Sequence, residues 1–201
     1  IFSIELGLVK HKEYIDMIEF PRQIDCGNFE MLKPDVTFDK AKEFFDLVKK
    51  NKDFLAKWLE WVGLYTKPEV AFNYLNSISD TKESSYLIQV DGKIVGGHGF
   101  VDVNERYKCA EIGYWLASDF NGRGFVTCGI KFLEDFAFGK CDMNRLQIKV
   151  DTENIKSQAV AKRAGYKQEG VLRHGYVLYG SPRDLIVYSK LKAEWEKGKQ
   201  K

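Results

Sequence analysis

The chain has 201 residues, which suits one domain with a substantial hydrophobic core. Its hydrophobic fraction of 44% and charged fraction of 30% exclude a wholly disordered protein. The 31 Lys and Arg residues nearly balance 29 Asp and Glu residues, and the net charge of +2 argues against a dedicated nucleic-acid-binding protein. Because no apolar run of about 18 residues and no recognisable signal peptide occurs, we expect a cytoplasmic protein without a membrane partner.

The cysteines and histidines do not have the spacing of a metal site. Cysteines stand at 26, 109, 128 and 141, and histidines at 11, 98 and 174. These spacings fit neither zinc binding nor a small disulfide scaffold, so we expect reduced thiols and no bound metal. The first residue is Ile, which indicates either a trimmed tag or a domain cut from a longer, fused chain.

The first half of the chain is predicted to be mainly helical. Residues 1–27 lack clean periodicity, so we expect an N-terminal extension or linker there. A short strand is predicted at 29–32. Apolar residues at helical spacing then predict three helices: one capped by Thr37, one over 54–62, and one with Pro68 in its first turn.

The second half alternates between strands and helices. Three antiparallel strands are predicted over 85–116, with Asp91-Gly92 as a hairpin turn between the first two. The further elements are a helix at 122–138, a strand at 145–150, a helix at 155–164 ended by Gly165, and an antiparallel pair at 166–178 and 185–191. We therefore expect a domain over 28–192 and a solvated, charged tail over 193–201.

The segment 121–127, Asn-Gly-Arg-Gly-Phe-Val-Thr, carries the strongest chemical signal. Gly122 and Gly124 lack the Cβ atoms that would keep a ligand away from the backbone. The N–H groups and the dipole of a helix first turn favour an anion such as pyrophosphate, and Arg123 adds a cation. The lysine of a P-loop and the third glycine of the dinucleotide fingerprint are both missing. A plain glycine-rich connection remains the alternative interpretation.

A series of motifs continues through the rest of the chain. It consists of Glu111-Ile112-Gly113-Tyr114-Trp115-Leu116, the 121–127 segment, Asp151-x-x-Asn154-x-x-Ser157, Gly165-Tyr166 and Glu169-Gly170. In these motifs the sequence resembles the GNAT superfamily of acetyl-CoA-dependent N-acetyltransferases. Within that superfamily it is similar to the Rim-type enzymes, which acetylate the N-terminal serine or alanine of ribosomal proteins. The resemblance implies an α/β fold with a mixed, mostly antiparallel, splayed sheet flanked by helices.

The resemblance also implies which residues bind acetyl-CoA. Its pyrophosphate would lie on the amides of the 122–127 segment, and its pantetheine arm would pair with the strand at 114–117. Asn154 would contact the pantetheine or the thioester end. The cofactor-binding candidates are therefore Trp115, Leu116, Asn121, Gly122, Arg123, Gly124, Phe125, Val126, Thr127 and Asn154.

Glu111 and Ser157 are the catalytic candidates. A free α-amine has a pKa of about 8, so a carboxylate acting through a water suffices as the base, and Glu111 matches a superfamily position that often holds one. Most members protonate the leaving thiolate with a tyrosine at the position of Ala161, and Ser157 is the best substitute. A solvent-facing Glu111 and a Ser157 that only caps the backbone remain alternatives.

The substrate-binding candidates are Trp58, Trp61, Phe72, His174 and Tyr176. The aromatic residues either pack the core or clamp a flat acceptor. Tyr176 stands where the ribosomal group has a glutamate, which weakens a ribosomal assignment, and His174 is an alternative base. The sequence also resembles the acetyltransferase domains of microcin C self-immunity proteins, which implies an aminoacyl-nucleotide antibiotic as the alternative acceptor.

Two other classes of function are weighed against an enzyme. A non-catalytic acyl-CoA sensor would use the same loop, and Ala161 favours it, whereas Glu111 and Ser157 favour catalysis. A nucleic-acid-binding module is disfavoured by the balanced charge. We expect an N-acetyltransferase, a monomer or homodimer, that binds acetyl-CoA and an α-amine on a protein N-terminus or an aminoacyl nucleotide.

Overall fold

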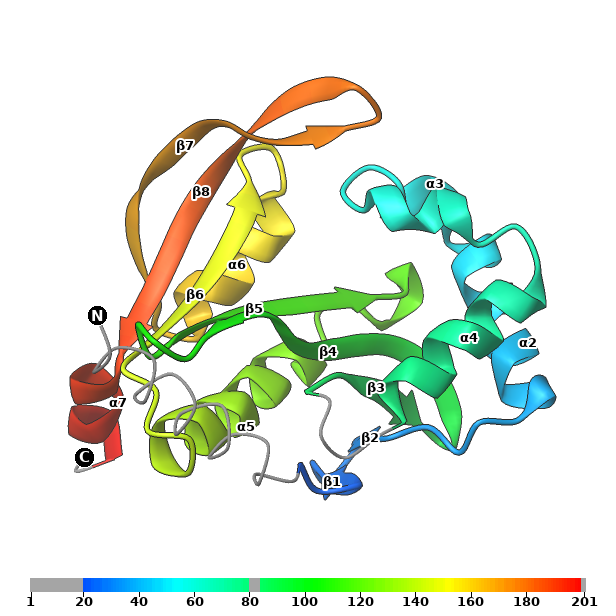
Figure 1. Cartoon of the computed structure of the whole chain (residues 1–201), viewed down its shortest axis with the longest axis horizontal. Coiled ribbons are helices and arrows are strands. Elements are labelled where there is room, and N and C mark those ends of the chain that lie inside the picture. The colour runs from blue at the N-terminus through cyan, green and yellow to red at the C-terminus, as the bar shows by residue number, and fades with distance from the viewer. Residues whose placement is uncertain (1–19, 80–83, 200–201) are drawn as a thin grey trace, which may run out of the picture.

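The computed structural model describes residues 20–79 and 84–199, which form one eight-stranded sheet flanked by helices (Figure 1). The strand order is β1-β2-β3-β4-β5-β6-β8-β7, and β5 and β6 are the parallel pair in an otherwise antiparallel sheet. The strands are Gln23–Asp25 (β1), Glu30–Leu32 (β2), Tyr86–Val90 (β3), Lys93–Asn104 (β4), Cys109–Leu116 (β5), Arg145–Asp151 (β6), Lys167–Leu178 (β7) and Ser181–Leu191 (β8). This confirms the predicted α/β fold with a mixed, mostly antiparallel sheet.

Helices cover both faces of the sheet. Successive strand residues point to opposite faces, and Tyr86 and Ile88 of β3 pack in the core under α5, whereas Leu87 packs against α2 and α4. The helices are Phe38–Lys50 (α2), Lys52–Leu55 (α3), Pro68–Ile78 (α4), Phe125–Gly139 (α5), Ile155–Arg163 (α6) and Lys192–Lys199 (α7), with 3₁₀ turns at Glu60–Leu64 (η1) and Ser118–Phe120 (η2). None of the helices in the described ranges has the length and apolar character needed to cross a bilayer.

Local sequence signals place several helix ends. The Thr37 hydroxyl accepts a hydrogen bond from the Lys40 N–H, and Pro68 opens α4, as predicted. Gly165 follows α6 with a φ of +80°. The helix predicted from 122 begins at Phe125 instead, because Gly122 and Gly124 have φ values of +79° and +85°, outside the right-handed helical region.

Three further predicted elements differ in the structure. The helix predicted over 54–62 is broken into α3 and η1, because Leu59 between them is extended (φ −129°, ψ 103°). β8 begins at Ser181, not at 185, because Tyr179 and Gly180 both have positive φ and form a hairpin turn. The tail after 192 forms α7, and its Trp195 ring lies 5.7 Å from the Phe138 ring.

The chain before the predicted domain boundary also contributes to the sheet. Residues 1–19, most of the predicted extension, lie outside the described residues. Phe20 is buried and stacks on Phe136 of α5 at a centroid distance of 4.3 Å, and β1 pairs with β2. The part of 1–27 that is described therefore packs on the domain.

β5 and β6 pair only at their first residues. Cys109–Glu111 lies opposite Arg145–Gln147, and beyond this point β5 follows β4 while β6 follows β8 (Figure 1). The edge of β5 from Ile112 onward therefore faces no other strand in the described part of the chain. Its backbone N–H and C=O groups are left to pair with a ligand.

β7 is the last strand in the sheet order, at the end opposite to β1, and is therefore an edge strand. Its pairing with β8 is interrupted twice, between Gln168 and Gly170 and between Leu172 and Tyr176. His174 lies inside the second interruption with a φ of +51°.

Candidate active site

A cavity of about 700 Å³ lies where β5 and β6 separate. Its wall is formed by these two strands, by β4, by the first turn of α6, and by aromatic side chains from residues 58–74. This volume is in the usual range for a small-molecule site. Seven of the predicted site residues line it: Trp58, Trp61, Glu111, Trp115, Asn154, Ser157 and Tyr176. Tyr114 of β5, which was not among the predicted site residues, lines it as well.

Ser157 and Tyr114 are in contact inside this cavity. The Ser157 Oγ lies 2.9 Å from the phenol oxygen of Tyr114. Asn154 is the N-cap of α6, and its side-chain oxygen accepts a hydrogen bond of 3.1 Å from the Ser157 N–H. The capping role considered for Ser157 therefore belongs to Asn154, and the Ser157 hydroxyl is available for other interactions.

The position of Ala161 cannot hold a tyrosine without rearrangement. Ala161 has no exposed surface and packs in the core beneath α6. The phenol nearest to Ser157 comes from β5 instead, as Tyr114. Burial raises the pKa of Tyr114 to about 12, although its hydrogen bond with Ser157 acts in the opposite direction.

Glu111 lines the cavity but is already paired. Its carboxylate lies 2.7 Å from the Lys149 ammonium, and its side chain is only 16% exposed. Gln147 on β6 donates a longer hydrogen bond of 3.4 Å to the same oxygen. The alternative of a solvent-facing Glu111 therefore does not fit the structure, and a water-mediated role as base must work beside Lys149.

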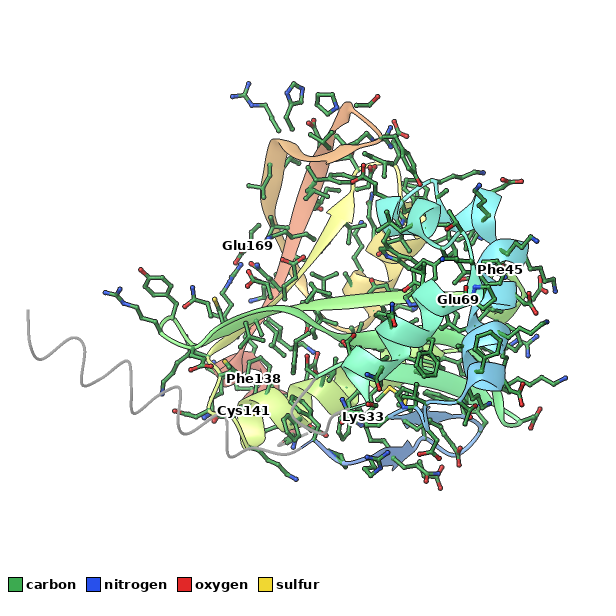
Figure 2. The ribbon with its side chains drawn as sticks, turned by 45° about the vertical axis from the view of Figure 1, so that its right-hand side comes forward. Lys33, Phe45, Glu69, Phe138, Cys141 and Glu169 are labelled. Carbon is green, nitrogen blue, oxygen red and sulfur yellow. The ribbon has the colours of Figure 1, made fainter. Side chains whose placement is uncertain are left out.

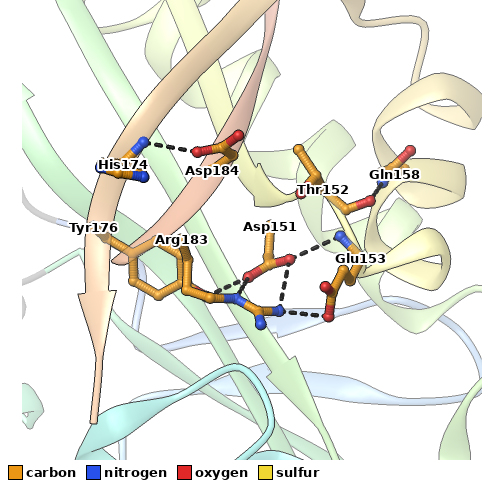
Figure 3. Close-up of polar contacts among 8 residues, drawn as sticks. All are labelled: Asp151, Thr152, Glu153, Gln158, His174, Tyr176, Arg183 and Asp184. Carbon is orange, nitrogen blue, oxygen red and sulfur yellow. Dashed lines mark hydrogen bonds and ion pairs between the residues drawn. The ribbon is translucent and has the colours of Figure 1, made fainter. Parts of the chain in front are cut away.

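A second paired carboxylate lies on the same wall (Figure 3). Asp151 accepts hydrogen bonds from the Tyr176 hydroxyl (2.6 Å) and from Arg183, whose Nε lies at 2.9 Å. Arg183 also donates to Glu153 at 2.7 Å. The Asp151 side chain is 4% exposed, and burial acts to raise its pKa. The hydrogen bonds from Arg183 and Tyr176 outweigh burial, so this pKa lies below its ordinary value.

Sequence reasoning missed the role of this cluster. Asp151 belongs to the Asp-x-x-Asn-x-x-Ser motif, but no local pattern connects it to Arg183 or Tyr176, which come from β8 and β7. Burial, and then the hydrogen bond to Asp151, raise the pKa of Tyr176 to about 12, so its hydroxyl stays protonated. Tyr176 therefore faces the cavity with its proton directed to Asp151.

The loop before α5 lies outside the cavity wall. Cβ atoms added at Gly122 or Gly124 would project into open space, and α5 has no side-chain cap. The first-turn N–H groups of a helix have no acceptor within that helix. The side chains of Phe125 and Val126 are buried in the core, so these residues offer a ligand their backbone rather than their side chains.

Other predicted cofactor residues have structural partners. Arg123 donates to the Asp119 carbonyl at 3.1 Å, and its guanidinium lies 5.0 Å from the Phe120 ring. Asn121 donates to the Ser118 carbonyl at 2.9 Å, and Leu116 is buried in the core. Asn121 and Arg123 therefore brace the loop, while Trp115 lines the cavity.

Aromatic side chains form the opposite wall. The Trp61 ring lies 5.4 Å from Tyr65 and 5.6 Å from Trp115, and Tyr65 contacts Tyr74. These rings pack against the core of α2 and α4 and also face the cavity. The same aromatic side chains can therefore pack against the core and form a wall for the substrate.

Two predicted substrate residues are not brought to the cavity. Phe72 points away from it on α4, whose Val70 and Tyr74 face inward, because successive helical residues turn by about 100°. His174 is exposed on β7, and its backbone N–H donates to Asp184 (Figure 3). Neither Phe72 nor His174 is one of the described residues that line the cavity.

His98 is a cavity residue that the sequence did not single out. It lines the cavity and is 4% exposed. Among the described residues, no group lies in hydrogen-bonding position to either ring nitrogen. Burial lowers its pKa to about 4, although the nearby Val126 carbonyl slightly favours the protonated form. Since burial dominates, His98 is neutral at pH 7.

Glu169, from the last motif of the series, has a structural role. It lies at the β7–β8 edge, away from the helices that carry Phe45 and Glu69 (Figure 2). Arg145 contacts it with two hydrogen bonds of 2.6 Å, and the Ser189 hydroxyl donates a third. These bonds lower the pKa of Glu169 to about 2 and tie β6, β7 and β8 together.

Acetyl-CoA fits the groups described above. The unpaired edge of β5 offers backbone partners to an extended amide-containing chain, and the glycine loop offers N–H groups to a pyrophosphate. A cavity with Ser157 and Asn154 lies between the two sheet halves. Within the described residues no cluster of His, Cys, Asp and Glu suited to a metal ion occurs.

Comparisons with known proteins agree with this geometry. The family model described as the acetyltransferase (GNAT) domain matches residues 34–167. YdaF of Bacillus subtilis (strain 168), whose name proposes a ribosomal N-acetyltransferase, is 32% identical over 164 residues, which cover 78% of this chain and 88% of YdaF.

Two solved structures extend the likeness. The microcin C7 self-immunity acetyltransferase MccE, solved with acetyl-CoA and AMP, superposes with a TM-score of 0.74 at 29% identity and covers 82% of this chain and 93% of its own. RimL, the ribosomal L7/L12 α-N-protein acetyltransferase solved with coenzyme A, superposes with a TM-score of 0.74 at 25% identity. The superposition covers 87% of this chain and 98% of RimL. The chain therefore belongs to the GNAT family and is an N-acetyltransferase that takes its acetyl group from acetyl-CoA.

Proposed function

We propose that the acceptor of this enzyme is an α-amine. The observation that carries the proposal is that both carboxylates of the cavity wall, Glu111 and Asp151, are already paired with Lys149 and Arg183. Among its described residues, such a wall has no free carboxylate to neutralise the positive charge of an amine that stays protonated at pH 7. An α-amine, with a pKa of about 8, is partly neutral at pH 7, whereas a lysine amine, at about 10.4, is not.

The chain's own groups have distinct proposed roles. The N–H groups of residues 122–127 bind the pyrophosphate, and the edge of β5 at 114–117 binds the pantetheine arm together with Asn154. The Ser157 hydroxyl donates to the leaving sulfur. Glu111 accepts the amine proton through a water.

Two acceptors are compatible with an α-amine. The names of YdaF and RimL support the N-terminus of a ribosomal protein. The aromatic wall, with Trp58 and Trp61, favours a flat group beside the amine, and the AMP in the MccE complex supports an aminoacyl nucleotide. We further propose that the enzyme acts in the cytoplasm as a monomer or homodimer, where its four free cysteines remain reduced.

The acceptor is tested by measuring thiol release from acetyl-CoA with three amines at equal concentration. These are a Ser-starting peptide, an aminoacyl sulfamoyl-adenosine, and an internal-lysine peptide with a blocked N-terminus. We expect transfer to one or both α-amines and none to the lysine. Acetylation of the lysine peptide alone would refute the proposal, and binding of acetyl-CoA without transfer to any amine would favour a sensor.

The aromatic wall is tested with a matched pair of variants. Trp58→Ala removes a ring that lines the cavity, whereas Phe72→Ala removes a ring on the neighbouring helix that does not. If a nucleotide is the acceptor, Trp58→Ala raises its KM about tenfold, the loss expected for one stacking contact of about 1–3 kcal/mol, and Phe72→Ala leaves it unchanged. An equal effect of both variants would remove the stacking role.

A further inference from the structure

Tyr114 and Ser157 connect the two halves of the splayed sheet. Tyr114 lies on β5, Ser157 lies in the first turn of α6, and both line the cavity. Besides the contact of 2.9 Å between the two oxygens, the Tyr114 oxygen lies 3.3 Å from the Ser157 backbone carbonyl. The Ser157 backbone is held by the bond from its N–H to Asn154, so rotation of the hydroxyl is its remaining freedom.

The two hydroxyl hydrogens allow two arrangements. A carbonyl only accepts, so when the Tyr114 phenol donates to the Ser157 carbonyl, the Ser157 hydroxyl donates to the phenol. When the phenol donates to the Ser157 Oγ instead, the serine hydrogen is free to point at a ligand. Tyr114 therefore sets the direction in which the serine donates.

The Tyr114 phenol retains its proton at neutral pH. Burial raises the pKa of Tyr114 to about 12, so it is a neutral donor wherever an α-amine is reactive. A hydroxyl that receives a hydrogen bond is a stronger donor in turn, because consecutive hydrogen bonds polarise one another.

We infer that Tyr114 is a positioning residue for the leaving group, and this inference rests on the proposed role of Ser157. The phenol donates to the Ser157 Oγ, which turns the serine hydrogen toward the thioester sulfur. The amine nitrogen forms a bond to the thioester carbon. As the carbon–sulfur bond then breaks, the sulfur takes the electron pair and accepts this hydrogen bond. The amine proton leaves through water, and the thiolate later takes a proton from solvent, so neither Tyr114 nor Ser157 loses its own proton.

The first test is a double-mutant cycle with Tyr114→Phe and Ser157→Ala. We expect each single variant to lower kcat about ten- to a thousandfold with both KM values within twofold, and the double variant to match Ser157→Ala. Tyr86→Phe is the control, because it removes a buried phenol on β3 that donates to the Pro21 carbonyl. Additive losses, or a raised KM with unchanged kcat, would overturn the inference.

A second measurement does not depend on the acceptor. The thiol of bound coenzyme A is titrated by its thiolate absorbance in the wild type and in both single variants. We expect the thiol pKa to be about one unit lower in the wild type, and equal in the two variants, because the thiolate loses the same hydrogen bond. If Tyr114→Phe leaves this pKa unchanged, the inference fails. If the pKa shifts but no α-amine is acetylated, the proposed acceptor fails instead.

Discussion

Acid destabilisation through His98 is the prediction that the structure specifies most closely. The His98 ring is buried, and its pKa in the folded protein is about 4, against about 6.5 in an unfolded chain. Between these two values the unfolded chain binds a proton that the folded protein does not. The free energy of unfolding therefore falls as the pH is lowered through 6.5, and the loss is complete below about 4.

The magnitude follows from the two pKa values. Integrated from pH 7 to pH 5, the difference in proton binding amounts to about 2 kcal/mol, and the full shift corresponds to about 3 kcal/mol. A domain with a typical stability of about 5–15 kcal/mol loses a measurable part of it.

The assay is urea unfolding of the ligand-free protein at pH 7, 6 and 5, for the wild type and for His98→Gln and His98→Leu. A constant cost of either substitution cancels, because only the change with pH is compared. We expect the wild type to lose about 2 kcal/mol more than either variant between pH 7 and 5. Identical pH dependence in the His98 variants and the wild type would refute the reasoning.

Three further predictions concern the loop, the serine and the paired carboxylate. Gly124→Ala should weaken coenzyme A binding at least tenfold by calorimetry, about 1.4 kcal/mol, whereas Gly180→Ala, which has a similar positive φ of +81° in open space, should not; equal affinities would remove the loop from the site. Ser157→Ala should lower kcat about ten- to a thousandfold with little effect on coenzyme A affinity, and a kcat within twofold of the wild type would exclude its role. Arg183→Met should lower the urea midpoint of unfolding, because it leaves the buried Asp151 carboxylate without its cation, and Asp151→Asn in the same chain should restore part of the loss; an unchanged midpoint would contradict the ion pair's importance.

Local signals in the sequence predicted much of the fold. Thr37 and Pro68 act on their own helices, and Asp91-Gly92 has the two positive φ values that its hairpin turn needs. The break at Leu59 had no such signal, because the apolar spacing over 54–62 continues through it. Its extended backbone depends on packing that only the folded chain provides.

The candidate site was predicted unevenly for a related reason. Asn154 and Ser157 lie in one motif, and the structure brings both to the cavity. His98 and Arg183 carry no motif, and their environments arise where α5 and β8 meet other elements, so their partners could not be deduced from neighbours in sequence. Phe72 was favoured for its residue type, but the face of α4 on which it lies is decided by the helix's packing.

The two interruptions in β7 have a consequence for how copies of this chain meet. An exposed edge strand presents unpaired N–H and C=O groups that invite strands of other molecules to add to the sheet. The breaks at 168–170 and 172–176 place the free groups of β7 out of line with the regular spacing that an incoming strand would need. Lys167 and Arg173 are exposed on the same strand and add charge there. The irregular edge thus disfavours the addition of another molecule's strand at β7.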